Sequence, residues 1–150
     1  MSTQYHHREA IATGVWLEDN LEAPDLRVFE CTTYLDPPAE GVDAAYSIRN
    51  AKAEFDVDHI PGACLIDLQD GLCDSSSPVH LRFMMPTPEV LSAAFADLGV
   101  SDGSQVVLYS RGSAMWATRV WWMLRAIGFD NAAVLDGGWE KWMLDNRPTS

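Results

Sequence analysis

Cysteine and basic residues are both scarce in this sequence. Its 150 residues include only three cysteines, Cys31, Cys64 and Cys73, and no two of them form a CxxC pair. Neither a disulfide framework nor a zinc knuckle is therefore indicated. Ten Lys and Arg stand against 22 Asp and Glu, which gives a formal net charge of -12. This charge argues against nucleic acid and anionic membranes as partners, and any small anion would have to be held by local donors.

Long apolar runs are also missing. No stretch reaches the length of a membrane span, and no basic region followed by an apolar core and a cleavage site opens the chain. We therefore expect a soluble, cytoplasmic protein. The adjacent histidines His6 and His7 have no third ligand nearby in the sequence, so we predict a solvated arm there. Neither a metal nor a cofactor is expected.

Aromatic residues, in contrast, are plentiful enough for a substantial core. The chain has six Trp and five Phe, and its length is typical of one domain. We predict a single domain over residues 1–150, with an ordered core of about 13–145. From Leu26 onward, predicted strands alternate with predicted helices. This order predicts an α/β fold with a mostly parallel central sheet and helices on both faces.

The expected elements follow from apolar runs, helix caps and turn residues. We expect strands at 26–31, 63–68, 106–109 and 132–135, and helices at 13–21, 48–55, 87–98, 113–127 and 139–144. Residues 34–44 contain Pro37, Pro38 and Gly41 and are expected to form a loop. Cys31 and Cys64 lie in apolar segments, so we expect both to be buried and inert.

The most informative stretch is the turn between the strand at 106–109 and the helix at 113–127. A sharp strand-to-helix turn leaves the first amide groups of the helix free, and the helix dipole adds positive potential there. Such a turn is an anion-binding loop. Arg111 adds a full charge, Gly112 allows close approach of a ligand, and Ser113 is the expected N-cap.

Two residues outside this turn stand in informative settings. Glu30 ends the strand at 26–31, where ligands collect in parallel sheets, so it is either catalytic or orders a neighbouring loop. His59 precedes the turn residues Pro61 and Gly62. It is expected to pin that turn by hydrogen bonds, because a general base would need a nucleophile beside it.

Two further motifs carry a resemblance to a known family. Phe55, followed by residues 59–63 (His-Ile-Pro-Gly-Ala), resembles the first rhodanese signature, and residues 136–139 (Asp-Gly-Gly-Trp) with Trp142 resemble the second. Residues 117–123 and 49–55 are similar to the amino-terminal domain of tandem thiosulfate and mercaptopyruvate sulfurtransferases. The resemblance extends from Trp16 to Trp142.

The resemblance implies a chemistry and a site. In this family a cysteine at the start of the loop takes the outer sulfur of thiosulfate, carries it as a persulfide, and passes it to cyanide or another thiophile. Ser110 stands in the position of that cysteine. A serine hydroxyl is almost wholly un-ionised and forms no stable sulfur–sulfur bond, so we expect no turnover of thiosulfate. The implied ligands of a small sulfur-containing anion such as thiosulfate are Arg111, Gly112, Ser113, Ala114, Met115, Arg49 and Arg119.

Three interpretations compete at this point. The first is a non-catalytic domain, from a tandem enzyme or a stand-alone relative of it, that acts with a second rhodanese domain or as a homodimer. The second is an active single-domain sulfurtransferase engineered to carry Ser110 in place of cysteine. The third is a regulatory module that binds an anion or a protein. The loop is too short for a related phosphatase, and a serine hydrolase is disfavoured because the GxSxG elbow is missing.

Overall fold

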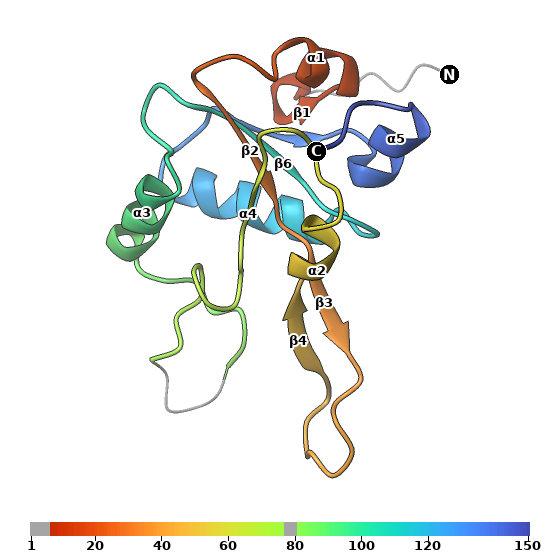
Figure 1. Cartoon of the computed structure of the whole chain (residues 1–150). Helices are drawn as coiled ribbons and strands as arrows, with labels where there is room; N and C mark the ends of the chain where they lie inside the picture. The colour runs from red at the N-terminus through yellow and green to blue at the C-terminus, as the bar shows by residue number, and fades with distance from the viewer. Residues whose placement is uncertain (1–6, 77–80) are drawn as a thin grey trace.

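A five-stranded parallel sheet forms the centre of the computed structural model, which describes residues 7–76 and 81–150 (Figure 1). The strand order is β1-β7-β6-β2-β5. Every pairing in this sheet is parallel, as predicted. The strands are β1 (Ile11–Ala12), β2 (Leu26–Glu30), β5 (Cys64–Leu65), β6 (Gln105–Tyr109) and β7 (Ala132–Leu135).

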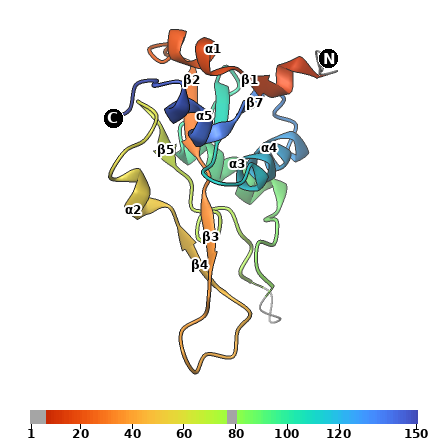
Figure 2. The ribbon, with the colours of Figure 1, turned by 90° about the vertical axis from the view of Figure 1, so that its right-hand side faces the viewer.

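Helices cover both faces of the sheet, which confirms the predicted α/β architecture (Figure 2). Alternate residues of β6 explain the two layers, since successive side chains of a strand point to opposite faces. The helices are η1 (Arg8–Ala10), α1 (Gly14–Asp19), α2 (Lys52–Phe55), α3 (Pro88–Asp97), α4 (Met115–Ala126) and α5 (Gly138–Leu144). Val106 and Leu108 pack in one apolar cluster with α3 and α4, whereas Val107 and Tyr109 pack in another with α1 and α5.

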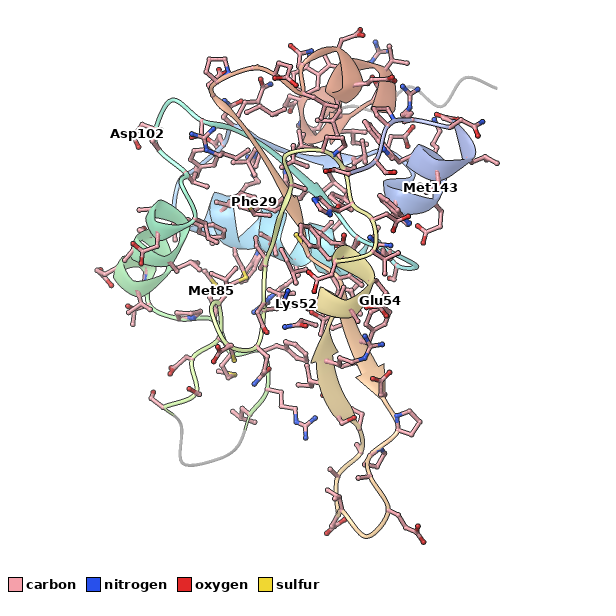
Figure 3. All side chains as sticks on the ribbon, in the orientation of Figure 1. Phe29, Lys52, Glu54, Met85, Asp102 and Met143 are labelled. Atoms are coloured by element: carbon pink, nitrogen blue, oxygen red, sulfur yellow. The ribbon has the colours of Figure 1, made fainter. Side chains whose placement is uncertain are left out.

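A β-hairpin projects from one end of the sheet, where the sequence predicted a loop and the first half of a helix (Figure 1). Strands β3 (Thr33–Asp36) and β4 (Ser47–Asn50) pair antiparallel, so the predicted loop at 34–44 and helix at 48–55 are both partly wrong. The prolines lie in the connection, outside the ladder, where they cost no strand hydrogen bond. Only α2 remains helical, with Lys52 and Glu54 at the base of the hairpin (Figure 3).

Further expectations need correction. The strand at 63–68 is only two residues long, because the Asp67 carboxylate accepts hydrogen bonds from the amides of residues 69 and 70 and starts a turn. Cys64 is exposed on this edge strand, whereas Cys31 is buried as expected. On the predicted helix at 113–127, Trp122 is about half exposed.

Membrane-spanning helices and metal-binding clusters are both absent from residues 7–76 and 81–150. No helix in these ranges is both long and apolar enough to cross a membrane. No three His, Cys, Asp or Glu residues in the same ranges are grouped so that they could hold a metal ion. The His6 of the predicted solvated arm lies outside the described residues.

Candidate functional site

The loop between β6 and α4 lies at the carboxyl end of the central strand. Parallel strands place the ends of β2, β6 and β7 at one edge of the sheet, so three connections meet there. Helix α4 begins with Met115, and its N-cap is Ala114. Ser113 is therefore not the N-cap, which corrects the prediction. Its hydroxyl instead accepts a hydrogen bond from the Met115 amide at 3.2 Å.

Ser110 is the first residue of this loop, and its side-chain hydroxyl forms a hydrogen bond within the loop. The residue is only 4% exposed, and its hydroxyl donates to the carbonyl of Ser113 at 2.6 Å. The Ser113 amide donates to the carbonyl of Arg111 at 2.8 Å, and Gly112 takes a φ of +71°. The tight turn expected from the sequence is present, with the hydroxyl proton of Ser110 engaged inside it.

The side chain of Arg111 is occupied by protein groups. Its Nε donates to the Glu30 carboxylate at 2.6 Å, and one Nη donates to the Asp58 carbonyl at 2.5 Å. The guanidinium also lies 4.1 Å above the ring of Trp139, within cation–π range. To bind a substrate, as the resemblance implies, Arg111 would have to leave these partners. Substrate binding by Arg111 therefore stays a prediction.

Glu30 is the centre of this network. It is fully buried and accepts hydrogen bonds from the Tyr109 hydroxyl at 2.9 Å and the Thr32 hydroxyl at 3.0 Å, besides those from Arg111. Thr32 in turn accepts from the Arg111 amide at 2.9 Å. These contacts join the ends of β2 and β6 to the loop. They fit the interpretation that Glu30 orders the loop.

The pKa values of two neighbours follow from this burial. Burial raises the pKa of the Tyr109 hydroxyl far above its usual range, and the charge of Glu30 adds to the effect. Burial disfavours the charge of Arg111, but its hydrogen bonds with Glu30 and Asp58 and the nearby negative charge outweigh that penalty and raise the pKa. Arg111 stays charged and Tyr109 stays neutral in the folded protein.

The second signature forms the other wall of the loop. The Trp139 amide donates to the carbonyl of Ser110 at 3.2 Å. A Cβ at position 138 would lie 2.7 Å from that carbonyl oxygen, so Gly138 permits the close approach. The Gly112 amide donates to Glu140 Oε1 at 2.6 Å. Sequence reasoning missed Glu140, because nothing distinguishes it from other acids on a short amphipathic helix.

The first signature also joins the network, through the turn before β5. The amide of Ile60 donates to the Tyr109 hydroxyl at 3.3 Å. His59 Nδ1 hydrogen-bonds the Phe55 carbonyl at 2.8 Å, and the two rings stack with centroids 4.0 Å apart. These are the contacts of a residue that pins a turn.

Arg49 and Arg119, the two other predicted ligands, are engaged elsewhere. Arg49 on β4 pairs with Asp36 at 3.0 Å and with Glu54 at 3.0 Å. Arg119 on α4 donates to the Phe83 carbonyl at 2.8 Å and lies 5.0 Å from the ring of Trp122. Neither side chain hydrogen-bonds residues 110–115 within the described ranges. The structure thus brings residues 110–115 together, whereas the hydrogen bonds of Arg49 and Arg119 join them to other parts of the chain.

This combination of fold and loop defines the class, an α/β domain whose strand-to-helix turn at residues 110–114 is enclosed by the two signature motifs. A family model of the rhodanese-like domain matches residues 14–145. The chain belongs to the rhodanese family.

Its relatives are sulfurtransferases. Thiosulfate/3-mercaptopyruvate sulfurtransferase 2 of Arabidopsis thaliana is 37% identical over 134 residues, which is 89% of this chain and 36% of the relative. The 3-mercaptopyruvate sulfurtransferase of Escherichia coli K12 is 31% identical over 131 residues, 87% of this chain and 43% of the relative. The chain therefore spans less than half the length of these relatives.

Solved structures agree with this assignment. The crystal structure of the 3-mercaptopyruvate sulfotransferase SseA from Escherichia coli superposes with a TM-score of 0.76 at 30% identity. The superposition covers 94% of this chain and 50% of that one. The YnjE structure gives a TM-score of 0.71 at 25% identity, with 99% of this chain and 32% of that chain covered. The predicted membership of the rhodanese family is confirmed.

Proposed function

We propose that this chain is a non-catalytic rhodanese domain, the amino-terminal domain of a tandem sulfurtransferase or a stand-alone relative of it, that supports a cysteine-bearing rhodanese domain. The observation that carries the proposal is Ser110. It stands where the family's sulfur-carrying cysteine is expected, and its hydroxyl is hydrogen-bonded to the Ser113 carbonyl at 2.6 Å. The proposed domain is the single unit 1–150, with a core of about 13–145.

The chemistry of sulfur transfer explains why Ser110 matters. In the family's reaction a thiolate attacks the outer sulfur of thiosulfate, sulfite leaves with the electron pair of the broken S–S bond, and a persulfide remains. Cyanide then takes the outer sulfur as thiocyanate and regenerates the thiolate. Each step needs a polarizable, ionised sulfur. An un-ionised serine hydroxyl inside a hydrogen bond supplies none, so catalysis is assigned to a second domain.

The exposed face of α4 is the surface we assign to that second domain. Met115 and Trp122 are 52% and 48% exposed, and Arg119 lies between them on the same helical face. Exposed aromatic and Met side chains around an arginine are typical of interfaces. The curated relatives are more than twice as long as the matched region, which leaves room for a second domain in them. In the resulting complex, the cysteine of the second domain would react with the small sulfur-containing anion.

The first experiment measures thiosulfate:cyanide sulfurtransferase activity of the unmodified chain and of Ser110→Cys by thiocyanate release. The proposal expects no activity from either, with the variant folded as judged by circular dichroism. Activity of Ser110→Cys alone would favour a disabled single-domain enzyme. Activity of the unmodified chain would overturn the assignment of Ser110 and redirect attention to the three native cysteines.

A second experiment tests the partner directly. A separately expressed cysteine-bearing rhodanese domain is titrated into the chain by calorimetry. Trp122→Ala is expected to weaken binding roughly tenfold or more, since tryptophans at interface centres carry much of the binding energy. Leu144→Ala is the control, because Leu144 is also apolar and exposed but lies on α5. Equal affinity of both variants would contradict the assigned surface, and a self-association of the chain would favour a homodimer.

A further inference from the structure

A carboxylate of the chain itself already lies on the anion-binding loop. Glu140 Oε1 accepts the amide proton of Gly112 at 2.6 Å, a short distance typical of a charge-assisted bond. A Cβ atom placed on Gly138 would lie 3.8 Å from Glu140 Oε2 and 2.7 Å from the Ser110 carbonyl oxygen. The carboxylate therefore lies beside the loop backbone at Ser110.

Among the described residues, no ion pair neutralises the charge of Glu140. Within residues 7–76 and 81–150, every salt bridge uses another acid. The adjacent Lys141 reaches Asp136 and Asp145 instead, each at 3.8 Å. Arg111, the cation of the loop, is held by Glu30 and Asp58. The loop thus presents a negative group where a substrate anion would need positive potential.

We infer that Glu140 is a built-in anion that keeps the 110–114 loop closed to anionic ligands. The inference rests on the proposed function and extends it: the domain lacks the nucleophile, and its loop is also blocked. An incoming anion would have to displace an intramolecular charge-assisted bond and would be repelled by the carboxylate at short range. Glu140 is a specificity-determining residue that turns anions away, and it takes no part in sulfur transfer.

A merely structural role for Glu140 can be separated from this one. Glu140 is in the first turn of α5, where an acid stabilises a helix through the dipole. Glu89 is likewise an acid in the first turn of a helix, α3. Its removal takes away the same charge and a comparable dipole interaction without touching the loop. Glu89→Ala is therefore the matched control for Glu140→Ala.

The experiment follows the Gly112 amide by ¹H–¹⁵N NMR while sodium thiosulfate is added, with sodium chloride at equal ionic strength as reference. In the unmodified chain and in Glu89→Ala the amide is expected downfield and only weakly responsive to thiosulfate. In Glu140→Ala the Gly112 amide resonance is expected to move upfield. Added thiosulfate should then change its chemical shift until saturation, with an apparent dissociation constant at least about fivefold lower than in the unmodified chain. Glu140→Gln, which keeps the side-chain shape, serves as a second variant with an intermediate response.

Two results would overturn the inference. One is an equal response of Gly112 in the unmodified chain and in Glu140→Ala, which would mean that the carboxylate blocks nothing. The other is no response in a folded Glu140→Ala, which would mean that the freed loop binds no anion. Neither result bears on thiocyanate release or on binding of a cysteine-bearing domain. The proposed function is therefore tested independently of this inference.

Discussion

The carboxylate of Glu30 and the guanidinium of Arg111 form a two-point ion pair beneath the candidate loop, with Nε–Oε1 at 2.6 Å and Nη2–Oε2 at 3.2 Å. Glu30 is fully buried, and the Arg111 side chain is only 11% exposed. The pair joins the end of β2 to the residue after Ser110. Arg111 therefore stabilises the loop through this pair, and the Glu30 carboxylate balances its charge before any ligand binds.

Breaking this pair should cost far more than breaking a surface pair. Glu30→Gln keeps the shape but leaves Arg111 with only its longer ion pair, to Asp58 at 3.4 Å, so we expect the free energy of unfolding in urea to fall by roughly 3 kcal/mol. Glu54→Gln removes an exposed partner of Arg49 and should cost less than about 1 kcal/mol. The double variant Glu30→Gln/Arg111→Met should recover part of the loss. Equal losses for the two single variants would contradict a structural role for the pair.

Two glycines of the site should respond differently to alanine. At Gly112, φ is +71° but a Cβ would meet no atom within 4 Å, so Gly112→Ala should cost only the backbone strain of roughly 1–2 kcal/mol. At Gly138, φ is +57° and the Cβ would press on the Ser110 carbonyl at 2.7 Å. Gly138→Ala should therefore cost about 1–3 kcal/mol more, measured by urea unfolding. The reverse order would show that the loop and α5 are not in close contact.

Cys31 should make the protein less stable in alkali. Burial, followed by the charge of Glu30, raises the pKa of the Cys31 thiol well above its ordinary value. As the pH rises above about 8.5, the unfolded chain releases the thiol proton while the folded chain keeps it, so the unfolded state gains. The free energy of unfolding should fall with a slope approaching ~1.4 kcal/mol per pH unit. That contribution should be absent in Cys31→Ala and kept in Cys64→Ala, and an unchanged slope in Cys31→Ala would contradict it.

A cysteine placed at position 110 should report the charge of Glu140. We expect Ser110→Cys to react slowly with iodoacetate, an anion, and Ser110→Cys/Glu140→Ala to react roughly fivefold faster. With neutral iodoacetamide the gain should be smaller. Peptide mass mapping separates the introduced thiol from the three native ones, and Ser110→Cys/Glu89→Ala is the control. The same rates in all three variants would mean that the carboxylate exerts no field at this position.

Local sequence patterns correctly predicted those elements whose signals lie close together along the chain. The apolar run of β6, the Thr87 cap and Pro88 start of α3, and the glycine after α4 all specify structure within a few residues, and the structure agrees. The β3–β4 hairpin escaped prediction. Its prolines suggested a loop, whereas pairing across the whole connection, from Asp36 with Ser47 to Thr33 with Asn50, decided the strands.

The sequence by itself determined the family, the parallel α/β fold and the position of the loop, because signature motifs, apolar periodicity and turn residues act over short distances along the chain. Only the tertiary structure decided what the loop residues contact. Arg111 meets Glu30 across 81 positions, and Gly112 meets Glu140 across 28. Such long-range pairings depend on which strand ends share an edge of the sheet, and no local pattern encodes that.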